Sequence, residues 1–314
     1  MTTHRAGPGV GPGTAQAAPS GSARTKQRQP QRPQETDLVP VCLTIGSSDS
    51  SGGAGIQGDV KAYASVGCYA ATVIVGLTAQ NTDGVTGRLS VPVPFVLEQL
   101  DTVLADLPCA AVKLGSTWSA ELLRALGPRL ARLAADGVPI VVDPVMVTAA
   151  GSLLADPAQT RDALFEHIFP SATVATPNRQ EIGLLLGDGG PGPAASRREL
   201  AEALVRAGVP AILVAGGPGE AGDWYFDGAR HEQLDGARHA TGAEHGVGCA
   251  HSTILAGLLA HGYSLYDAAI EAQRRAGTAV LGGHTDIGAR LHPVDALGLR
   301  ERAEQVRLRF APGE

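Results

Sequence analysis

The stretch "VPVCLTIGSSDSSGGAGIQGDVKAYASVGCYAATVIVGLT", residues 39–78, decides the fold class. It begins with a short apolar run (39–46), continues with the spacing of an amphipathic helix (55–67), and ends with a second apolar run (70–78). Short apolar, β-branched runs on either side of a helix are typical of parallel strands that are covered on both faces. The stretch therefore predicts a strand, a helix and a parallel strand.

The same alternation continues along the chain. Further apolar runs lie at 110–115, 139–144, 172–177 and 210–217, and further helical patterns at 94–107, 120–137 and 197–208. We therefore predict one α/β domain over residues 38–314, with three layers: a mostly parallel central sheet and helices on both faces. In such a sheet, ligands bind beyond the carboxyl ends of the strands, so the residues that follow each strand are the place to look for chemistry.

The composition is that of a globular chain without a membrane segment. With 314 residues, of which 44% are hydrophobic, the chain can bury a full core. No run of about 18 apolar residues suggests a membrane span, and the N-terminus lacks the pattern of a secretory signal. The four cysteines show neither metal-ligand spacing nor a disulfide framework, which favours the cytoplasm.

Residues 1–37 differ from the rest, because they are rich in Gly, Pro, Ala, Gln and Ser and have few large apolar side chains. Such a segment cannot offset its ordering entropy, and we predict a disordered tail. The tail has five basic and two acidic residues, which leaves 20 basic against 29 acidic residues, a net charge of −9, on the rest. A domain this acidic is not expected to bind nucleic acid.

Glycine or polar residues follow each predicted strand. The segments are "IGSSDSSGGAG" (45–55), "TAQNTDG" (78–84), "KLGST" (113–117), "VDPVM" (142–146), "TPNRQE" (176–181), "AGGPGE" (215–220) and "EHGVGC" (244–249). The first segment does not have the G-x-G-x-x-G pattern of dinucleotide-binding proteins, and the chain has no G-x-x-x-x-G-K-[ST] phosphate loop.

The segment "HGVGC" precedes an apolar helical pattern. Glycines at a helix start leave backbone N–H groups free to bind an anion, and the helix dipole adds positive potential. We therefore predict an anion site at Gly246, Val247 and Gly248. Cys249 follows directly, and a thiol at a helix start is expected to have a lowered pKa. Cys42, Cys68 and Cys109 are interpreted as buried apolar residues.

In order and content, these motifs resemble the hydroxymethylpyrimidine and phosphomethylpyrimidine kinases of thiamine biosynthesis, within the ribokinase-like superfamily. The resemblance covers about residues 40–290, and "SSGGAGIQ" with "AQNT" is specific. It implies an ATP- and magnesium-dependent kinase that phosphorylates 4-amino-5-hydroxymethyl-2-methylpyrimidine and then its monophosphate. Relatives are commonly dimers, so a homodimer is possible. Pyridoxal kinases are the nearest relatives in chemistry.

The resemblance also implies roles for residues at the phosphate side of the site. The anion at residues 246–248 is the transferring phosphoryl group, and Cys249 is the base that accepts the proton of the substrate hydroxyl. Asp143 and Glu181 hold Mg²⁺ and its waters, with Asn178 and Lys113 near the ATP phosphates. A plainer interpretation makes Asn178 a helix cap and Glu181 its capping partner, and both roles can coexist.

On the substrate side, the resemblance points to Asp59, Gln80 and the backbone of Val145, with Ser47 and Ser116 at neighbouring positions of the pocket. A side-chain amide such as that of Gln80 can pair with both a ring nitrogen and an exocyclic amine. The plainer interpretation of Asp59 is a solvated charge on a helix face.

The chain departs from the family pattern at several positions. Ala215 and Ala149 stand where the family usually has lysine, and Val247 replaces a threonine. Ser116 and Ser47 replace a methionine and a glycine, which makes the pocket more polar. Two alternatives therefore stay open: a kinase for another hydroxymethyl heterocycle, such as pyridoxal or a pathway-specific pyrimidine, and a non-catalytic pyrimidine-binding relative.

Overall fold

The computed structural model describes residues 38–147, 153–192, 194–216, 222–236 and 241–310. All of them belong to one compact unit, Gln31–Glu314. The predicted tail, residues 1–37, and the substituted lysine position Ala149 lie outside the described residues.

The described residues form a nine-stranded sheet in the order β3-β2-β1-β4-β5-β6-β7-β8-β9. The six strands from β2 to β7 pair in parallel, whereas β3, β8 and β9 pair antiparallel to their neighbours at the two edges. The bounds are β1 Val41–Asp49, β2 Tyr69–Asn81, β3 Gly84–Ser90, β4 Cys109–Leu114, β5 Ile140–Val142, β6 Val174–Ala175, β7 Ile212–Val214, β8 Trp224–Phe226 and β9 His231–Gln233. The predicted mostly parallel sheet is confirmed, and the antiparallel edges are new.

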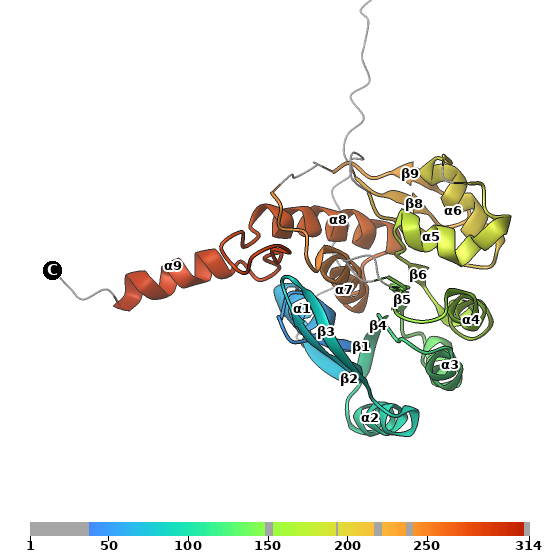
Figure 1. Ribbon diagram of the computed structural model, residues 1–314, viewed down its shortest axis with the longest axis horizontal. Helices are drawn as coiled ribbons and strands as arrows, with labels where there is room; N and C mark the ends of the chain where they lie inside the picture. Colours follow the sequence, from blue (N-terminus) through green and yellow to red (C-terminus); the bar gives the residue numbers. More distant parts are fainter. Residues whose placement is uncertain (1–37, 148–152, 193, 217–221, 237–240, 311–314) are drawn as a thin grey trace, which may run out of the picture. The chain divides into compact units, whose positions relative to one another are not determined.

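Helices cover both faces of the sheet, as the sequence predicts (Figure 1). One apolar cluster packs α2 to α6 against the sheet, and the other packs α1, α7 and α8 against the opposite face. The bounds are α1 Gly55–Ser65, α2 Val93–Asp106, α3 Ala120–Ala135, α4 Pro157–Ala163, α5 Arg179–Leu186, α6 Arg197–Arg206, α7 Val247–Ala260, α8 Leu265–Leu281 and α9 Leu299–Phe310. Short π and 3₁₀ turns occupy Leu164–Ile168, Phe169–Ser171 and Gly187–Gly189.

Two local features shape the edge of the sheet where the parallel strands end. The register of β1 against β2 shifts between Gly46 and Ser47. This irregularity changes the direction of the side chains in the last residues of β1, next to the loop before α1. At α5, Asn178 and Glu181 form a capping box, which fixes where that helix begins. Among the described residues, no helix is both long and apolar enough to cross a membrane.

Candidate active site

One cavity of about 460 Å³ opens at the carboxyl ends of the parallel strands. Every site residue predicted from the sequence lines it: Ser47, Asp59, Gln80, Lys113, Ser116, Asp143, Val145, Asn178, Glu181, Gly246, Val247, Gly248 and Cys249. These residues come from six separate segments of the chain, and the fold brings them together. Their individual roles stay predictions.

The start of α7 forms one wall of this cavity. Gly246 precedes the helix with a φ of 84°, and a side chain there would collide with the carbonyl oxygen of Gly53. Both the left-handed backbone and this close approach require glycine. The N–H of Val247 donates to the carbonyl of Glu244 at 3.2 Å, so it is already engaged within the turn. We therefore expect the N–H groups of Gly246 and Gly248 to contribute most to an anion site.

A buried pair that the sequence did not reveal ties this wall to the glycine-rich loop after β1. His245 Nε2 lies 2.9 Å from Asp49 Oδ2, and the same carboxylate accepts hydrogen bonds from Ser51 and the N–H of Ala54. Burial alone would raise the pKa of Asp49, but the hydrogen bonds from His245, Ser51 and Ala54 outweigh it and lower the pKa. An ionised Asp49 thus orders the loop and holds it against residue 245.

Asp59 and Lys113 form a second buried pair beneath the cavity. Lys113 Nζ donates to both carboxylate oxygens of Asp59 at 3.0 Å, and Thr44 and Thr253 donate to the same carboxylate at 2.6 and 2.8 Å. Lys113 Nζ also lies 3.7 Å from Asp143 Oδ2. Asp59 is fully buried, so its interpretation as a solvated helix charge is wrong.

The ammonium group of Lys113 remains charged despite its burial. Burial lowers the pKa of Lys113, but the negative charges of Asp59 and Asp143, and that of Cys249 when ionised, outweigh it and raise the pKa. Lys113 therefore supplies fixed positive potential from below the cavity, with Asp59 as its main partner.

The thiol of Cys249 lies beside this charge cluster, and here the prediction of a lowered pKa is wrong. Burial raises the pKa of Cys249 to about 12. Lys113 and the N–H of Gly55 act in the opposite direction, while Asp59 and Asp143 raise the pKa further. The helix start alone does not set the state of this thiol, because carboxylates from α1 and the end of β5 surround it.

Asp143, Asn178 and Glu181 form the acidic side of the cavity. Asn178 accepts a hydrogen bond from the N–H of Glu181 at 3.0 Å, and Glu181 accepts one from the N–H of Asn178 at 3.0 Å. The capping interpretation is therefore confirmed. Burial and the charge of Asp143 raise the pKa of Glu181 to about 8, although the N–H groups of Asn178 and Met146 oppose the shift. Burial also raises the pKa of Asp143.

This acidic pair fits a hard cation. Asp143 and Glu181 offer oxygen ligands only, both side chains are buried, and the charge of Asp143 raises the pKa of Glu181. Mg²⁺ favours one or two carboxylates together with water and substrate phosphates. Among the described residues, no group of three or more His, Cys, Asp or Glu side chains could hold a metal ion.

Three of the residues predicted to bind the substrate lie around the ends of β1, β2 and β4. Ser47, Gln80 and Ser116 line the cavity together, and Gln80 Oε1 accepts a hydrogen bond from Thr78 at 3.1 Å. Trp118 also lines the cavity, and sequence reasoning missed it. The available signal was its position directly after the strand-end segment "KLGST".

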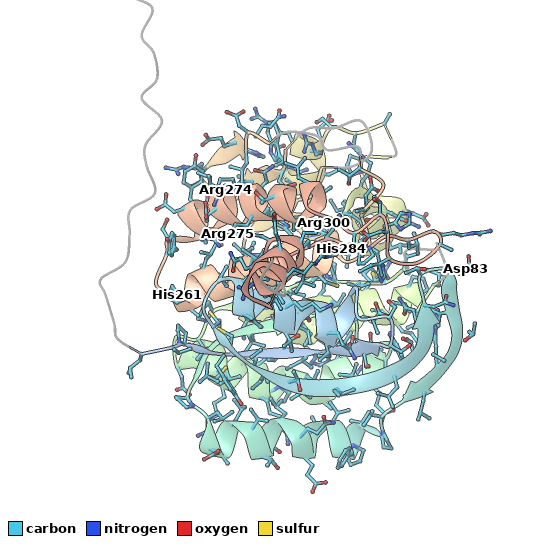
Figure 2. The ribbon with its side chains drawn as sticks, turned by 90° about the vertical axis from the view of Figure 1, so that its left-hand side faces the viewer. Asp83, His261, Arg274, Arg275, His284 and Arg300 are labelled. Atoms are coloured by element: carbon cyan, nitrogen blue, oxygen red, sulfur yellow. The ribbon has the colours of Figure 1, made fainter. Side chains whose placement is uncertain are left out.

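The sequence also missed the contacts of a strap, residues 284–294, that runs along one side of the cavity. The N–H groups of Ala289 and Leu291 donate to the side chain and carbonyl of Thr82 at 3.0 and 2.9 Å, next to Asp83 at the tip of the β2–β3 hairpin (Figure 2). The next residue of the strap, His292, accepts a hydrogen bond from the N–H of His245 at 3.0 Å. The strap therefore joins the hairpin to the anion site, and its Leu291 lines the cavity.

Of the two positions where the resemblance suggests lysine, Ala215 lines the cavity and Ala149 lies outside the described residues. A different basic side chain, His251 of α7, also lines the cavity. Its Nε2 lies 3.2 Å from Asp223 Oδ2, and Asp223 accepts a hydrogen bond from the N–H of Gly216 at 2.9 Å.

Comparisons with known proteins agree with this geometry. The sequence profile of the family described as phosphomethylpyrimidine kinase matches residues 49–295. The chain is 41% identical over 234 residues to a hydroxymethylpyrimidine/phosphomethylpyrimidine kinase of Rhizobium meliloti, an alignment that covers 74% of this chain and 86% of the relative. It is 40% identical to a thiamine biosynthesis bifunctional protein of Geobacter sulfurreducens, over 74% of this chain and 47% of that longer protein.

Solved structures share the fold. A Staphylococcus aureus pyridoxal kinase in complex with pyridoxal is 27% identical, with a TM-score of 0.72 over 84% of this chain and 95% of that one. A Clostridium difficile phosphomethylpyrimidine kinase is 30% identical, with a TM-score of 0.62 over 75% of this chain and 96% of that one.

Proposed function

Since the chain belongs to the phosphomethylpyrimidine kinase family, we propose that it phosphorylates the hydroxymethyl group of 4-amino-5-hydroxymethyl-2-methylpyrimidine and then the resulting monophosphate. The resemblance seen in the sequence motifs is confirmed, and the chain is an ATP-dependent phosphotransferase of thiamine biosynthesis. The identity of its heterocycle is argued below.

The backbone at the start of α7 is the main observation in support of this function. Phosphoryl transfer needs positioning and positive potential more than covalent chemistry, because charge spreads over the phosphoryl oxygens in the transition state. Gly246 and Gly248 line the cavity at the positive end of α7, and Gln80 lines the same cavity. A hydroxymethyl group between Gln80 and Cys249 would therefore meet the phosphoryl group at the anion site.

The carboxylates of Asp143 and Glu181 would hold Mg²⁺, with Asn178 keeping the side chain of Glu181 in place. When bound, the ion neutralises phosphate charge. Lys113 adds positive charge on the protein side of the same region, through its contact with Asp143.

The thiol of Cys249 is the proposed acceptor of the hydroxyl proton. Because its pKa is raised to about 12, only a small fraction is ionised at neutral pH. That fraction is a strong base, and binding of a cation to Asp143 and Glu181 removes part of the negative charge that raises the pKa.

A substrate panel tests the function. The purified protein is incubated with ATP, Mg²⁺ and each of 4-amino-5-hydroxymethyl-2-methylpyrimidine, its monophosphate and pyridoxal, and formation of ADP and of each phosphorylated product is measured. We expect the pyrimidine and its monophosphate to be phosphorylated. Absence of ADP formation with every substrate would indicate a non-catalytic pyrimidine-binding protein and reject the proposal.

A pyridoxal kinase is the second candidate. The specific observation in its favour is the higher TM-score of the Staphylococcus aureus pyridoxal kinase, 0.72 against 0.62 for the phosphomethylpyrimidine kinase. Ser47 and Ser116 also line the pocket with hydroxyl groups, which suits a hydroxylated ring. In the panel, a kcat/KM for pyridoxal above that for the pyrimidine would favour this candidate.

Homodimer formation and a cytoplasmic location are part of the proposal. Leu77, Leu89 and Phe95 expose 40%, 63% and 54% of their surface on the β2–β3 hairpin and α2, which gives an apolar face that a second copy could cover. Light scattering during gel filtration measures the mass, and a monomer at micromolar concentration would contradict the dimer.

A further inference from the structure

Trp118 has an unusual backbone conformation for its residue type. Its φ is 57°, and it is the one non-glycine residue with a positive φ in the part of the chain that the structure describes. For a bulky side chain this region is disfavoured, and such strain concentrates at functional sites. The strained residue lies between the end of β4 and Ser119, which caps α3, and it lines the cavity.

A glycine in β2 makes room for the indole of Trp118. A Cβ at Gly76 would overlap three carbon atoms of the six-membered ring of Trp118. Glycine inside a buried strand weakens it, and the usual reason is the close approach of another group. Two locally unfavourable features, the strained Trp118 and the strand glycine Gly76, therefore combine to place one aromatic ring.

Two polar atoms of the segment that follows β4 have no partner in the described part of the chain. Trp118 Nε1 and Ser116 Oγ are buried and make no hydrogen bond within the described part of the chain. An unpaired buried polar group is costly, so each one in a native protein calls for an explanation. The edge of the indole that contacts Gly76 belongs to its six-membered ring, so Nε1 lies on the other ring, away from this contact.

The strand order shows on which side of the cavity Trp118 lies. The strand order places β2, β1 and β4 side by side, and Trp118 follows β4 while it contacts β2. The end of β1 between them carries Ser47, and Gln80 ends β2. The acidic pair and the capping box follow β5 and β6, further along the sheet. Trp118 therefore lies on the heterocycle side of the cavity.

We propose that Trp118 is a substrate-recognition residue whose indole packs against the planar ring of the substrate, while its Nε1–H, together with Ser116 Oγ, binds a hydrogen-bond acceptor on that ring. The ligand class is a nitrogen heteroaromatic ring with an acceptor on the edge turned toward β4. This inference rests on the proposed kinase function and adds a specificity residue to it. An aminopyrimidine and a 3-hydroxypyridine both carry such an acceptor, and the experiment distinguishes them.

The chain offers a direct optical test, because it contains only two tryptophans. Trp224 lies on β8, where its Nε1 donates to His231 Nδ1 at 2.8 Å, so a Trp224→Phe protein keeps Trp118 as its single reporter. That protein is titrated without ATP, once with the aminopyrimidine and once with pyridoxal. We expect a saturable change in fluorescence, with the tighter dissociation constant for the ring that the enzyme phosphorylates.

Kinetics of Trp118→Phe test the hydrogen bond. This variant keeps an aromatic ring and loses the N–H, so we expect the KM of the heterocycle to rise about tenfold, with little change in kcat or in the KM of ATP. Trp224→Phe is the matched control and should keep the parent KM. Gly76→Ala displaces the indole without changing its chemistry, and we expect it to raise the same KM.

The results distinguish a failure of the proposed role of Trp118 from a failure of the proposed kinase function. An unchanged KM in Trp118→Phe, together with no response of Trp118 fluorescence to saturating heterocycle, would overturn the role of Trp118 while the parent still turns over its substrate. If the parent phosphorylates no heterocycle but Trp118 fluorescence still responds to one of them, the kinase function fails and the recognition residue stands.

Discussion

The pH dependence of phosphoryl transfer should depend on Cys249, because burial raises the pKa of its thiol. With a pKa raised to about 12, ionisation at pH 7.5 costs about 6 kcal/mol, at about 1.36 kcal/mol per pH unit. The general-base contribution of a positioned group is about 10²- to 10⁴-fold in rate. If the thiolate is the base, its scarcity limits the chemical step.

The thiolate fraction rises tenfold per pH unit as long as the pH stays below the pKa. We therefore expect the single-turnover rate, measured by rapid quench with saturating ATP, Mg²⁺ and pyrimidine, to rise about 100-fold between pH 7 and pH 9. Cys249→Asp has no thiol, so its rate should lose the tenfold rise per pH unit. Cys249→Ala should lose the same rise and should be slower than the parent at pH 9.

Cys109→Ala is the matched control. Its thiol also has a pKa raised by burial, to about 11, but it lies at the start of β4, at the opposite end of that strand from the cavity. This variant should keep the parent profile. A parent rate that is flat between pH 7 and 9, or a Cys249→Ala protein that keeps the parent rate and slope, would refute the thiolate base and leave catalysis to the anion site and the cation.

Three further substitutions test the surroundings of the cavity. Thr82→Val removes an acceptor that anchors the strap, and it should raise the KM of the heterocycle about fivefold; Thr86→Val, which removes a hydrogen bond elsewhere on the same hairpin, should leave KM unchanged. Lys113→Met should lower the free energy of unfolding, measured in urea, by about 3–5 kcal/mol. Adding Asp59→Asn to this variant should recover part of that loss. Equal stability of the single and the double variant would contradict a coupled pair. Gln80→Ala should weaken heterocycle binding by about 1–3 kcal/mol, and an unchanged KM would remove Gln80 from the pocket.

Local sequence patterns predicted most of the fold because they record burial directly. The apolar runs at 110–115 and 139–144 became β4 and β5, and the pattern at 120–137 became α3. The capping box at Asn178 and Glu181 could also be predicted, since both partners lie within one helical turn. The short edge strands β8 and β9 were missed, because three residues are too few to show a period.

The electrostatics of the site could not be predicted in the same way. The lowered pKa expected for Cys249 followed from its place at a helix start, which is a local property. The groups that raise its pKa, Asp59 and Asp143, come from α1 and the end of β5. Only the packed structure brings these charges together and buries the thiol in part, and this desolvation is the largest cause of the raised pKa.

Contacts between distant loops explain why the strand-end segments act as one site. Asp49 and His245 lie 196 residues apart in sequence and 2.9 Å apart in the structure, and His245 in turn donates to the carbonyl of His292 in the strap. The strap then reaches Thr82 on the hairpin that carries Gln80. The hairpin that carries Gln80 and the loop that begins α7 are thus linked by hydrogen bonds through the strap.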